Sequence, residues 1–555
     1  MRKYFVLGTV SILLLNGFVA IIYPRVLWSM VFLGPVIAIG CYDYFQRRRA
    51  VLRNFPILGH FRYLLESIRP EISQYFIESD TDGRPFSRDQ RSVVYQRAKR
   101  VRDTVPFGTL KDVYEVGYEW VNHSMKPLHL EPGELRVTVG GPDCEQPYSA
   151  SLFNISAMSF GALSKNAVLA LSRGAMMGQF AHNTGEGGLS PYHLEGGGDL
   201  IWQIGTGYFG CRTQDGKFCP ETFAEKAVHP NVKMLEVKLS QGAKPGHGGI
   251  LPAAKLTREI AEIRGVPMGQ DVLSPPAHSA FATPIELLQF VAKLRSLSGG
   301  KPTGFKLCVG KRREFLALCK AMVKTGITPD FITVDGGEGG TGAAPLEFTN
   351  HIGAPLIDSL IFVHNALVGF SLRDKIRILA SGKVLTGFGM VKRLALGADI
   401  CYSARGMMMA LGCIQALKCN SNRCPVGVTT QNPALVAGLV VEDKSTRVAH
   451  FHHENLKSVG EIIGAMGIAH PADLRPWHIM RRTSPTEIKH YGEIYEFLSH
   501  GDLLKEDLPS SYKRACHAAS PNSFEHASAG IGAGAIRAET HTVIQVQKEA
   551  PSVRG

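Results

Sequence analysis

The sequence predicts an α/β fold: a (β/α)8 TIM barrel preceded by two transmembrane helices. The chain has 555 residues, 45% of them hydrophobic, which is enough for one domain of about 250–300 residues with appendages. From Ser149 onward, short apolar runs alternate with segments of helical period, as in βα units around a parallel sheet. Most runs end in glycine-rich or polar segments, which predicts a ligand-binding face at the carboxyl ends of the strands.

Six of these runs are the predicted barrel strands. Each is short and rich in β-branched or other apolar residues, which is typical of a buried parallel strand. They cover residues 152–156, 235–239, 303–308, 331–334, 376–380 and 399–403. No internal repeat of solenoid period accompanies them, so a single barrel is favoured over a repeat architecture.

Two apolar stretches at the start of the chain predict a membrane hairpin. Residues 5–23 and 26–42 are each close to the roughly 20 residues that cross a bilayer, and Pro24 and Arg25 separate them. Basic residues precede the first stretch and follow the second, at residues 2–3 and 47–53. The positive-inside rule then predicts an inner-membrane protein with both ends and its main domain facing the cytoplasm. Two buried core helices are the alternative, disfavoured because the stretches are apolar all round.

These features divide the chain into five predicted parts. Residues 1–50 form the hairpin, 51–147 a segment that packs on the barrel, and 148–433 the barrel itself. Residues 434–515 are expected to form a helical extension, and 516–555 a flexible tail.

Net charge and cysteine content exclude two classes of protein. The formal charge is +13, but Lys and Arg are scattered and no nucleic-acid-binding motif is present, so no nucleic-acid partner is expected. Part of the excess lies beside the predicted membrane spans, where it can meet anionic head groups. The eleven cysteines are unevenly spaced, which argues against a secreted disulfide framework.

Three crowded cysteines predict a metal centre. Cys413, Cys419 and Cys424 bring three thiolates within twelve residues, and Lys418 and Arg423 can offset negative charge there. Thiolates select soft metals and iron–sulfur clusters, and three ligands suit a 3Fe-4S cluster. A zinc site would want a fourth ligand, which is absent nearby, and unrelated buried thiols are the third reading.

Several ordered motifs resemble the FMN-binding synthase domain of glutamate synthases over residues 149–433. The longest is GCIQALKCNSNRCPVGVTTQ at 412–431, which looks like the 3Fe-4S motif of that family. The others are SAMSFGALS at 156–164, NTGEGG at 183–188, QGAKPG at 241–246, DGG at 335–337 and GTGAAP at 340–345. The resemblance implies that the barrel binds FMN and an iron–sulfur cluster.

The resemblance also implies which residues hold FMN. Backbone N–H groups of glycine-rich loops cradle phosphates, and three such loops follow successive predicted strands. The family's phosphate-end positions match Gly336, Gly337, Gly382, Lys383, Ala404 and Arg405. Met158 and Ser159 match the segment against the flavin ring, and Lys306 would stabilise the anionic reduced ring.

For the substrate, the resemblance implies two cationic anchors and three catalytic positions. Lys244 and Arg264 match the residues that hold the 2-oxoglutarate carboxylates. The catalytic positions match Lys306, Glu186 and Gln241, and Glu186 could equally brace a loop. The chain departs from the family where it has His247 and Ile250 in place of Glu and Gln, which opens the identity of the acid.

The implied reaction is reductive amination of a 2-oxo acid, with 2-oxoglutarate giving L-glutamate. Electrons would come from a ferredoxin or a reductase subunit and pass through the cluster to FMN. The chain begins Met1-Arg2 without the family's glutaminase nucleophile, so free ammonia, an amine or a separate subunit is expected to supply nitrogen. An FMN-dependent dehydrogenase or an enzyme forming N-substituted glutamate is one alternative, and a membrane-bound electron carrier is another.

A histidine cluster offers a competing metal site. His450, His452 and His453 lie before a charged stretch of helical period. Because no partner ligands occur at a suitable spacing, these side chains are expected on the solvated surface.

Overall fold

Eight parallel strands close into a barrel in the computed structural model, which describes residues 1–101, 104–131, 133 and 135–525. Each strand pairs with the next along the chain, and β13 pairs with β4 to complete the ring. The predicted (β/α)8 fold is confirmed. The strands are β4 (Phe153–Ile155), β5 (Ala181–Asn183), β6 (Asp199–Ile204), β7 (Val232–Lys238), β10 (Thr303–Leu307), β11 (Phe331–Asp335), β12 (Arg377–Ser381) and β13 (Ile400–Ser403).

All six strands named from the sequence are present, with ends shifted by up to three residues. The sequence reading missed two strands, β5 and β6. β5 has only three residues, and its His182 and Asn183 are polar yet fully buried. β6 begins at Asp199, directly after three glycines. The apolar run is short in both segments, Ala181 alone in β5 and residues 200–202 in β6. Contacts with neighbouring strands stabilise both.

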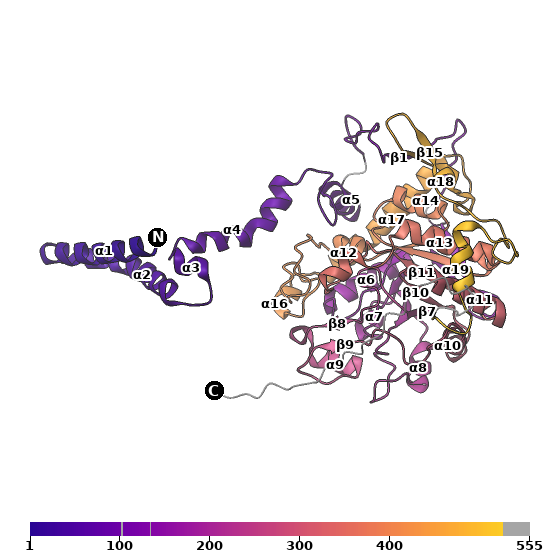
Figure 1. The fold of residues 1–555 in the computed structure, drawn as a ribbon, viewed down its shortest axis with the longest axis horizontal. Coiled ribbons are helices and arrows are strands. Elements are labelled where there is room, and N and C mark those ends of the chain that lie inside the picture. Colours follow the sequence, from indigo (N-terminus) through magenta and orange to yellow (C-terminus); the bar gives the residue numbers. More distant parts are fainter. Residues whose placement is uncertain (102–103, 132, 134, 526–555) are drawn as a thin grey trace, which may run out of the picture.

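Helices surround the barrel (Figure 1). Helix α10 shows why they form where they do: Thr283 and Glu286 make a capping box at its start, and Leu287, Val291 and Leu294 bury one stripe. The helices are α6 (Lys165–Gly178), α7 (Pro191–Glu195), α8 (Pro220–Ala227), α9 (Arg258–Arg264), α10 (Pro284–Leu297), α11 (Arg312–Thr325), α12 (Leu346–His351), α13 (Leu356–Gly369), α14 (Gly387–Ala395) and α15 (Arg405–Ala410).

A hairpin closes the amino-terminal end of the barrel. It consists of β2 (Arg136–Val139) and β3 (Tyr148–Ser151), which pair antiparallel. Val139, Tyr148 and Ala150 pack with interior residues of six barrel strands in one buried cluster. Since this end is filled by apolar side chains, a ligand can enter the barrel from the carboxyl ends of the strands.

Above this cluster the barrel interior is polar. The carboxylate of Glu236 on β7 accepts hydrogen bonds from the Asn183 and Gln203 side-chain amides at 2.8 and 2.6 Å, and from the Thr333 hydroxyl at 2.5 Å. All four residues are buried. The network links β5, β6, β7 and β11 and satisfies a carboxylate that would otherwise be costly to bury.

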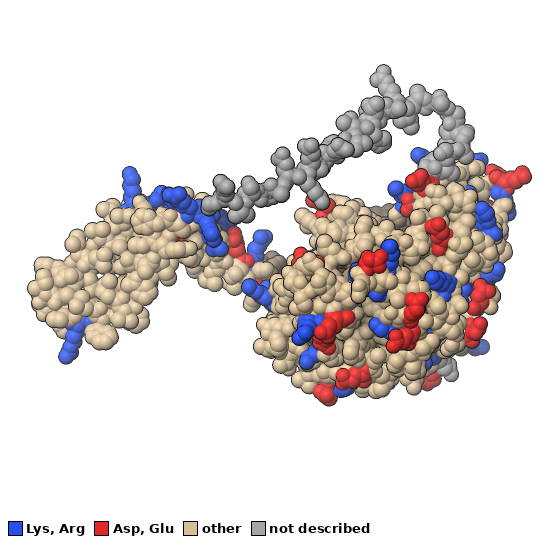
Figure 2. Space-filling view, turned by 90° about the horizontal axis from the view of Figure 1, so that it is seen from below, with Lys and Arg blue, Asp and Glu red and all other residues tan. Residues whose placement is uncertain are grey.

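The chain begins with two apolar helices, α1 (Arg2–Ile22) and α2 (Met30–Phe45), joined by the 3-10 turn η1 (Pro24–Ser29). Arg2–Ile22 and Pro24–Phe45 are long and apolar enough to cross a membrane by length and composition. Neither is a core helix, since almost none of either span is buried. Figure 2 shows this lobe with few charged side chains, basic ones at its margins, whereas the barrel surface mixes both signs.

The segment after the hairpin divides in two, which corrects the expectation that all of 51–147 packs on the barrel. Helices α3 (Ala50–Asn54) and α4 (Gly59–Ile72) continue from α2, where the buried Asp43 binds His60 at 2.9 Å and the backbone N–H of Ile57 at 3.0 Å. Along α4, Phe61 and Leu64 stay exposed instead of packing. After the π-helical turn η2 (Ser73–Ile77), α5 (Arg88–Lys99) packs on α15 and on the long helix α17 (Val441–Ala465) (Figure 1).

The region after the barrel is mixed, whereas a helical extension was predicted. Strand β14 pairs with β1 on one side and β15 on the other, because β1 supplies an edge from the segment before the barrel. Helix α19 continues past the predicted start of the tail, and residues 526–555 lie outside the described residues. The elements are β1 (Glu119–Val121), α16 (Pro433–Val436), α17 (Val441–Ala465), β14 (Ile479–Arg482), β15 (Ile488–His490), α18 (Tyr491–Ile494) and α19 (Ser510–Ala518).

Candidate functional site

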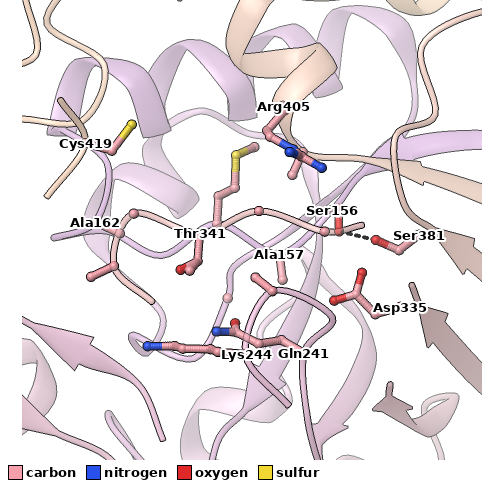
Figure 3. Close-up of a pocket in the computed structure, with 18 of the residues that line it drawn as sticks. Ser156, Ala157, Ala162, Gln241, Lys244, Asp335, Thr341, Ser381, Arg405 and Cys419 are labelled. Atoms are coloured by element: carbon pink, nitrogen blue, oxygen red, sulfur yellow. Dashed lines mark hydrogen bonds between the residues drawn. The ribbon is translucent and has the colours of Figure 1, made fainter. Parts of the chain in front are cut away.

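A cavity of about 1180 Å³ opens at the carboxyl ends of the barrel strands. It is large enough for a cofactor together with a small substrate. Thirteen of the residues predicted for the site line it: Met158, Ser159, Glu186, Gln241, Lys244, Arg264, Lys306, Gly337, Gly382, Lys383, Ala404, Arg405 and Cys419. In Figure 3, Lys244 and Gln241 lie on one side of the cavity and Arg405 on the opposite side.

Two buried cations face the cavity without a counter-ion of their own. Lys244 is 2% exposed and Arg264 is 4% exposed, and neither makes an ion pair among the described residues. Burial lowers the pKa of Lys244 to about 8 and that of Arg264 to about 10, while Glu186 partly opposes the shift in each. Arg264 donates a hydrogen bond to the Phe160 carbonyl at 3.0 Å. Its buried Nε has no hydrogen-bond partner among the residues that the structure describes. Buried cations held in this way favour a carboxylate ligand.

Glu186 forms an ion pair with Lys238, which was not predicted as a site residue. Its carboxylate lies 3.0 Å from Lys238 Nζ, and both side chains line the cavity. Burial would raise the pKa of Glu186, but Lys238, with smaller contributions from Arg264 and Lys244, outweighs it and lowers the pKa. Glu186 is therefore an anion near neutral pH. A signal for Lys238 was present: a lysine two residues after Glu236 must face the same side of β7, the barrel interior.

Lys306 also has an acidic partner. Its ammonium lies 3.2 Å from the Asp335 carboxylate at the end of β11. Burial alone would lower the pKa of Lys306, but Asp335 and Glu236 outweigh it and raise the pKa. Lys306 thus stays protonated inside the cavity. Asp335 also accepts the backbone N–H of Gly242 at 2.8 Å and so fixes the loop that carries Gln241 and Lys244.

Glycines let two loops meet beside the cavity. A Cβ on Gly242 would lie 1.8 Å from the Gly336 carbonyl oxygen, so only glycine fits there. Gly336 itself does not line the cavity, whereas Gly337 does. Gly382 adopts a φ of 153° before Lys383, and β12 and β13 deliver Lys383 and Arg405 to the same end of the cavity. Two cations and exposed backbone at one end make an anion site.

Met158 and Ser159 lie on the loop after β4, beside the loop after β5. A Cβ on Gly185 would lie 2.7 Å from the Ser159 backbone nitrogen, so the two loops approach closely. Ser156 and Ser381 hydrogen bond across the cavity wall at 3.2 Å, as Figure 3 shows. This side of the cavity therefore presents backbone and small polar groups, which suit an aromatic ring that carries hydrogen-bonding edges.

The three cysteines lie on the loop between α15 and α16. Cys424 is buried, Cys413 and Cys419 are half-buried, and Cys419 reaches the cavity. Burial would raise the pKa of Cys424, but N–H donors from Thr429, Val426 and Val428 outweigh it and lower the pKa. Across residues 1–101, 104–131, 133 and 135–525, no three His, Cys, Asp or Glu side chains converge as ligands of a single metal ion.

The prediction of a solvated histidine cluster is wrong for His452. This residue is buried on α17, where its ring stacks on Phe180 with centroids 3.8 Å apart and hydrogen bonds Ser151 at 2.9 Å. Burial lowers its pKa to about 3, so the ring is neutral. His450 and His453 are half-buried. The error arose because helical period places one of three neighbouring residues on the buried face.

The two positions that depart from the family motif have different surroundings. Ile250 lines the cavity from β8 (Ile250–Leu251), which pairs with β9 (Val272–Leu273). His247 does not line it; its ring packs against Phe348 with centroids 5.2 Å apart. Ile250 thus puts an apolar side chain on the cavity wall, whereas His247 packs against Phe348 of α12.

A profile described as the conserved region in glutamate synthase matches residues 102–469. The chain belongs to the glutamate synthase family. The glutamate synthase large subunit-like protein YerD of Bacillus subtilis is 37% identical over 525 residues, covering 87% of this chain and 98% of that protein. The archaeal-type glutamate synthase [NADPH] of Thermotoga neapolitana is 34% identical over 315 residues, 56% of this chain and 59% of that protein. Membership of the glutamate synthase family makes this chain a glutamate synthase-like oxidoreductase.

Proposed function

We propose that the protein reduces the imine of a 2-oxo acid, forming L-glutamate from 2-oxoglutarate and ammonia. The observation that carries this is the pair of buried cations Lys244 and Arg264 at one cavity, neither of which makes an ion pair with a residue that the structure describes. Two fixed cations suit a dicarboxylate, and a guanidinium can hold one carboxylate with two parallel hydrogen bonds. The relatives named glutamate synthase agree with this substrate class.

FMN is the proposed cofactor, since the cavity fits its two ends. Gly337, Gly382 and the cations Lys383 and Arg405 offer an anion cradle for its phosphate, and the wall at Met158 and Ser159 suits its ring. Bound there, FMN would accept electrons and supply the hydride for the reduction. The protonated Lys306 would support negative charge on the reduced ring.

The chain's own residues prepare the substrate. Lys244 and Arg264 orient the acid so that its 2-carbon faces the ring site, which replaces a chance encounter by a fixed geometry. The Glu186 carboxylate and Lys238 ammonium, 3.0 Å apart, can exchange protons with an amine at the same carbon. Gln241 lies on the loop with Lys244 and can hydrogen bond the bound acid.

A 3Fe-4S cluster on Cys413, Cys419 and Cys424 is the proposed electron entry. A cluster spreads its ligands over several iron atoms, so the cysteines need not converge on one point. The N–H groups around Cys424 favour a thiolate, as ligation of iron requires. Lys255, whose Nζ donates to the Cys419 carbonyl at 3.4 Å, would offset the negative charge. The electron donor would be a ferredoxin or a reductase subunit.

Membrane attachment belongs to the same proposal. Two apolar helices with basic flanks support a hairpin in the inner membrane, with the barrel on the cytoplasmic side. The barrel would then work next to the bilayer.

A second candidate keeps the chemistry and changes the acid. Ile250 gives the cavity wall an apolar side chain where a hydrogen-bonding one would select 2-oxoglutarate, so a less polar 2-oxo acid or an N-substituted product would fit. A pure electron carrier is disfavoured, because it would have no use for two buried cations at a cavity.

One assay separates these readings. The full-length protein is reduced without oxygen and mixed with ammonium and each of a series of 2-oxo acids, while flavin absorbance and amino-acid products are followed. We expect 2-oxoglutarate to reoxidise the flavin fastest and to yield L-glutamate. Faster reoxidation by another acid would favour that acid as the substrate, and no reoxidation by any acid would contradict a reaction with ammonia.

The anchor is tested in the same assay. Lys244→Ala removes a charge-assisted contact worth about 1.5–3 kcal/mol, so the KM for 2-oxoglutarate should rise about 10- to 100-fold. The control Lys513→Ala lies on α19 with its side chain 55% exposed and should change nothing. An unchanged KM in Lys244→Ala would refute the anchor.

A further inference from the structure

The short segment Arg84–Phe86, between η2 and α5, forms part of the cavity wall although it lies far from the barrel in sequence. It also lies outside residues 102–469, so the family profile gives it no role. Phe86 is 1% exposed, while Arg84 remains exposed overall and lines the cavity with part of its side chain.

Phe86 is held on both sides of its backbone. The side-chain amide of Gln415 donates to the Phe86 carbonyl at 3.2 Å and accepts the Phe86 N–H at 3.2 Å. Arg91 donates to the same carbonyl at 2.9 Å. Gln415 lies two residues after Cys413, so the cysteine loop and α5 together fix the place of this one phenylalanine.

The Phe86 ring supports the two cations of the anion cradle. The Arg405 guanidinium carbon lies 4.7 Å from the ring centroid and the Lys383 ammonium 5.6 Å from it. Both distances are within the range of a cation–π contact. Arg405 is held further by a 2.7 Å hydrogen bond to the Glu338 carbonyl, so its direction is set before any ligand arrives.

Arg84 brings a third positive charge to the same place. Burial and the nearby Arg405 lower the pKa of Lys383, and Arg84 adds to the effect. Arg84 makes no ion pair with any residue that the structure describes. Glu338, which also lines the cavity, opposes the shift of Lys383. Three cations beside this carboxylate and the backbone freed by Gly382 favour a doubly charged anion over a single carboxylate.

We propose that Arg84 and Phe86 complete the phosphate end of the flavin site: Arg84 binds the phosphate monoester of FMN, and Phe86 positions Lys383 and Arg405 for it. The inference rests on the proposed FMN site. It makes the segment before the barrel part of the cofactor site.

The test compares two ligands that differ only in the phosphate. The full-length protein in detergent is freed of flavin and titrated with FMN and with riboflavin, and binding is followed by flavin fluorescence. Arg84→Ala should weaken FMN about tenfold and riboflavin less than about twofold. The matched control Arg88→Ala removes an exposed arginine four residues on, which pairs with Asp80, and should leave both affinities unchanged.

Phe86→Leu provides the second variant, since it keeps an apolar residue but removes the aromatic face. We expect FMN to lose more affinity than riboflavin. The proposal for Arg84 fails if Arg84→Ala binds FMN like the wild type, or if both flavins weaken equally. If the wild-type protein binds neither flavin, the FMN proposal itself fails. That outcome differs from FMN binding equally well to the wild type and to Arg84→Ala, which would contradict only the role of Arg84.

Discussion

At the scale of single residues, charge decides what the cavity can bind. Lys306 and Glu186 each have a partner of opposite sign within about 3 Å, whereas Lys244 and Arg264 have none among the described residues. The charges of Lys306 and Glu186 are therefore balanced by their partners, whereas Lys244 and Arg264 present positive charge to a ligand. A buried cation without a partner is costly, which is a reason to expect an anion there.

Binding of the acid should depend on pH through Lys244. Its pKa is lowered to about 8, so the ammonium is present below pH 8 and is lost as the pH rises through that value. The affinity for 2-oxoglutarate should fall above pH 8, measured by calorimetric titration from pH 6.5 to 9.5. Lys244→Arg keeps its charge across this range and should flatten the profile. An equally steep profile in Lys244→Arg would assign the titration to another group.

Iron content should depend on the predicted cysteines alone. Cys419→Ser removes one proposed ligand, and we expect loss of bound iron, measured by metal analysis, and of the cluster signal in electron paramagnetic resonance. Cys219→Ser, another half-buried cysteine at the start of α8, should retain both. If Cys419→Ser kept its iron, or if the wild type held none, the cluster would be disproved.

At the scale of elements, strand order creates the site. Residues far apart in sequence, such as Met158 after β4 and Arg405 after β13, face one cavity because β4 and β13 are paired neighbours in the closed barrel. Two buried carboxylates, Glu236 in the barrel interior and Asp330 at the amino-terminal end of β11, link elements of the barrel through hydrogen bonds. Glu236 links four strands, and Asp330 links α10, β10 and the loop after β2.

Asp330 should be the more sensitive point for stability. Its buried carboxylate accepts from Arg295 at 2.9 Å, from the Thr303 N–H at 2.7 Å and from the Gly141 N–H at 2.6 Å. Asp330→Asn removes the charge and leaves the buried Arg295 with only the more distant Asp143 carboxylate, 3.6 Å away, so the free energy of unfolding should fall by about 3 kcal/mol. Urea unfolding followed by circular dichroism measures it.

The control for that experiment is Asp374→Asn. This aspartate is exposed on the 3-10 turn η5 (Arg373–Lys375), and its replacement should change stability by less than about 0.5 kcal/mol. Equal stability of Asp330→Asn and Asp374→Asn would show that the buried pair contributes no net stability.

At the scale of the whole molecule, an apolar hairpin is joined to an oxidoreductase barrel. The connection is specific: Gln74 on η2 donates to the Ile414 carbonyl at 3.0 Å, and Tyr95 on α5 donates to the Cys413 carbonyl at 2.8 Å. The segment that leads from the hairpin thus contacts the cysteine loop directly. A membrane-bound protein would hold its proposed electron entry close to the bilayer.

The full-length protein should sediment with membranes after a carbonate wash, which releases peripheral proteins. A double substitution, Leu13→Arg with Leu14→Arg, puts two charges in the middle of α1 and should move protein to the soluble fraction, because each costs about 2.5–3.5 kcal/mol in a bilayer. Leu504→Arg, at an exposed leucine outside the hairpin, should not. Release of the wild type by carbonate would contradict the membrane assignment.

Much of the fold was predictable because its signals are local. Buried apolar runs marked six of eight barrel strands, and long motifs marked the loops of the cavity. Contacts between distant segments were not predictable: the burial of His452 against Phe180, and the pairing of β14 with β1, depend on which surfaces meet in three dimensions. The ion pair of Lys238 with Glu186 was not predictable either, because the two residues are 52 positions apart in sequence and adjacent only in the barrel.

The sequence by itself determined the barrel, the membership of the glutamate synthase family and the residue types of the site. The alternation of apolar runs with helical segments, the glycine-rich loops and the motif spacing are all local features of the chain. Only the tertiary structure decided which charges are compensated. Lys244, Lys238 and Lys306 all face one cavity, yet among the described residues two have carboxylate partners and Lys244 has none. Only folding brought Arg84 and Phe86 to Arg405. The reason is physical: the energy of a charge depends on its distance to other charges and to water, and folding sets both.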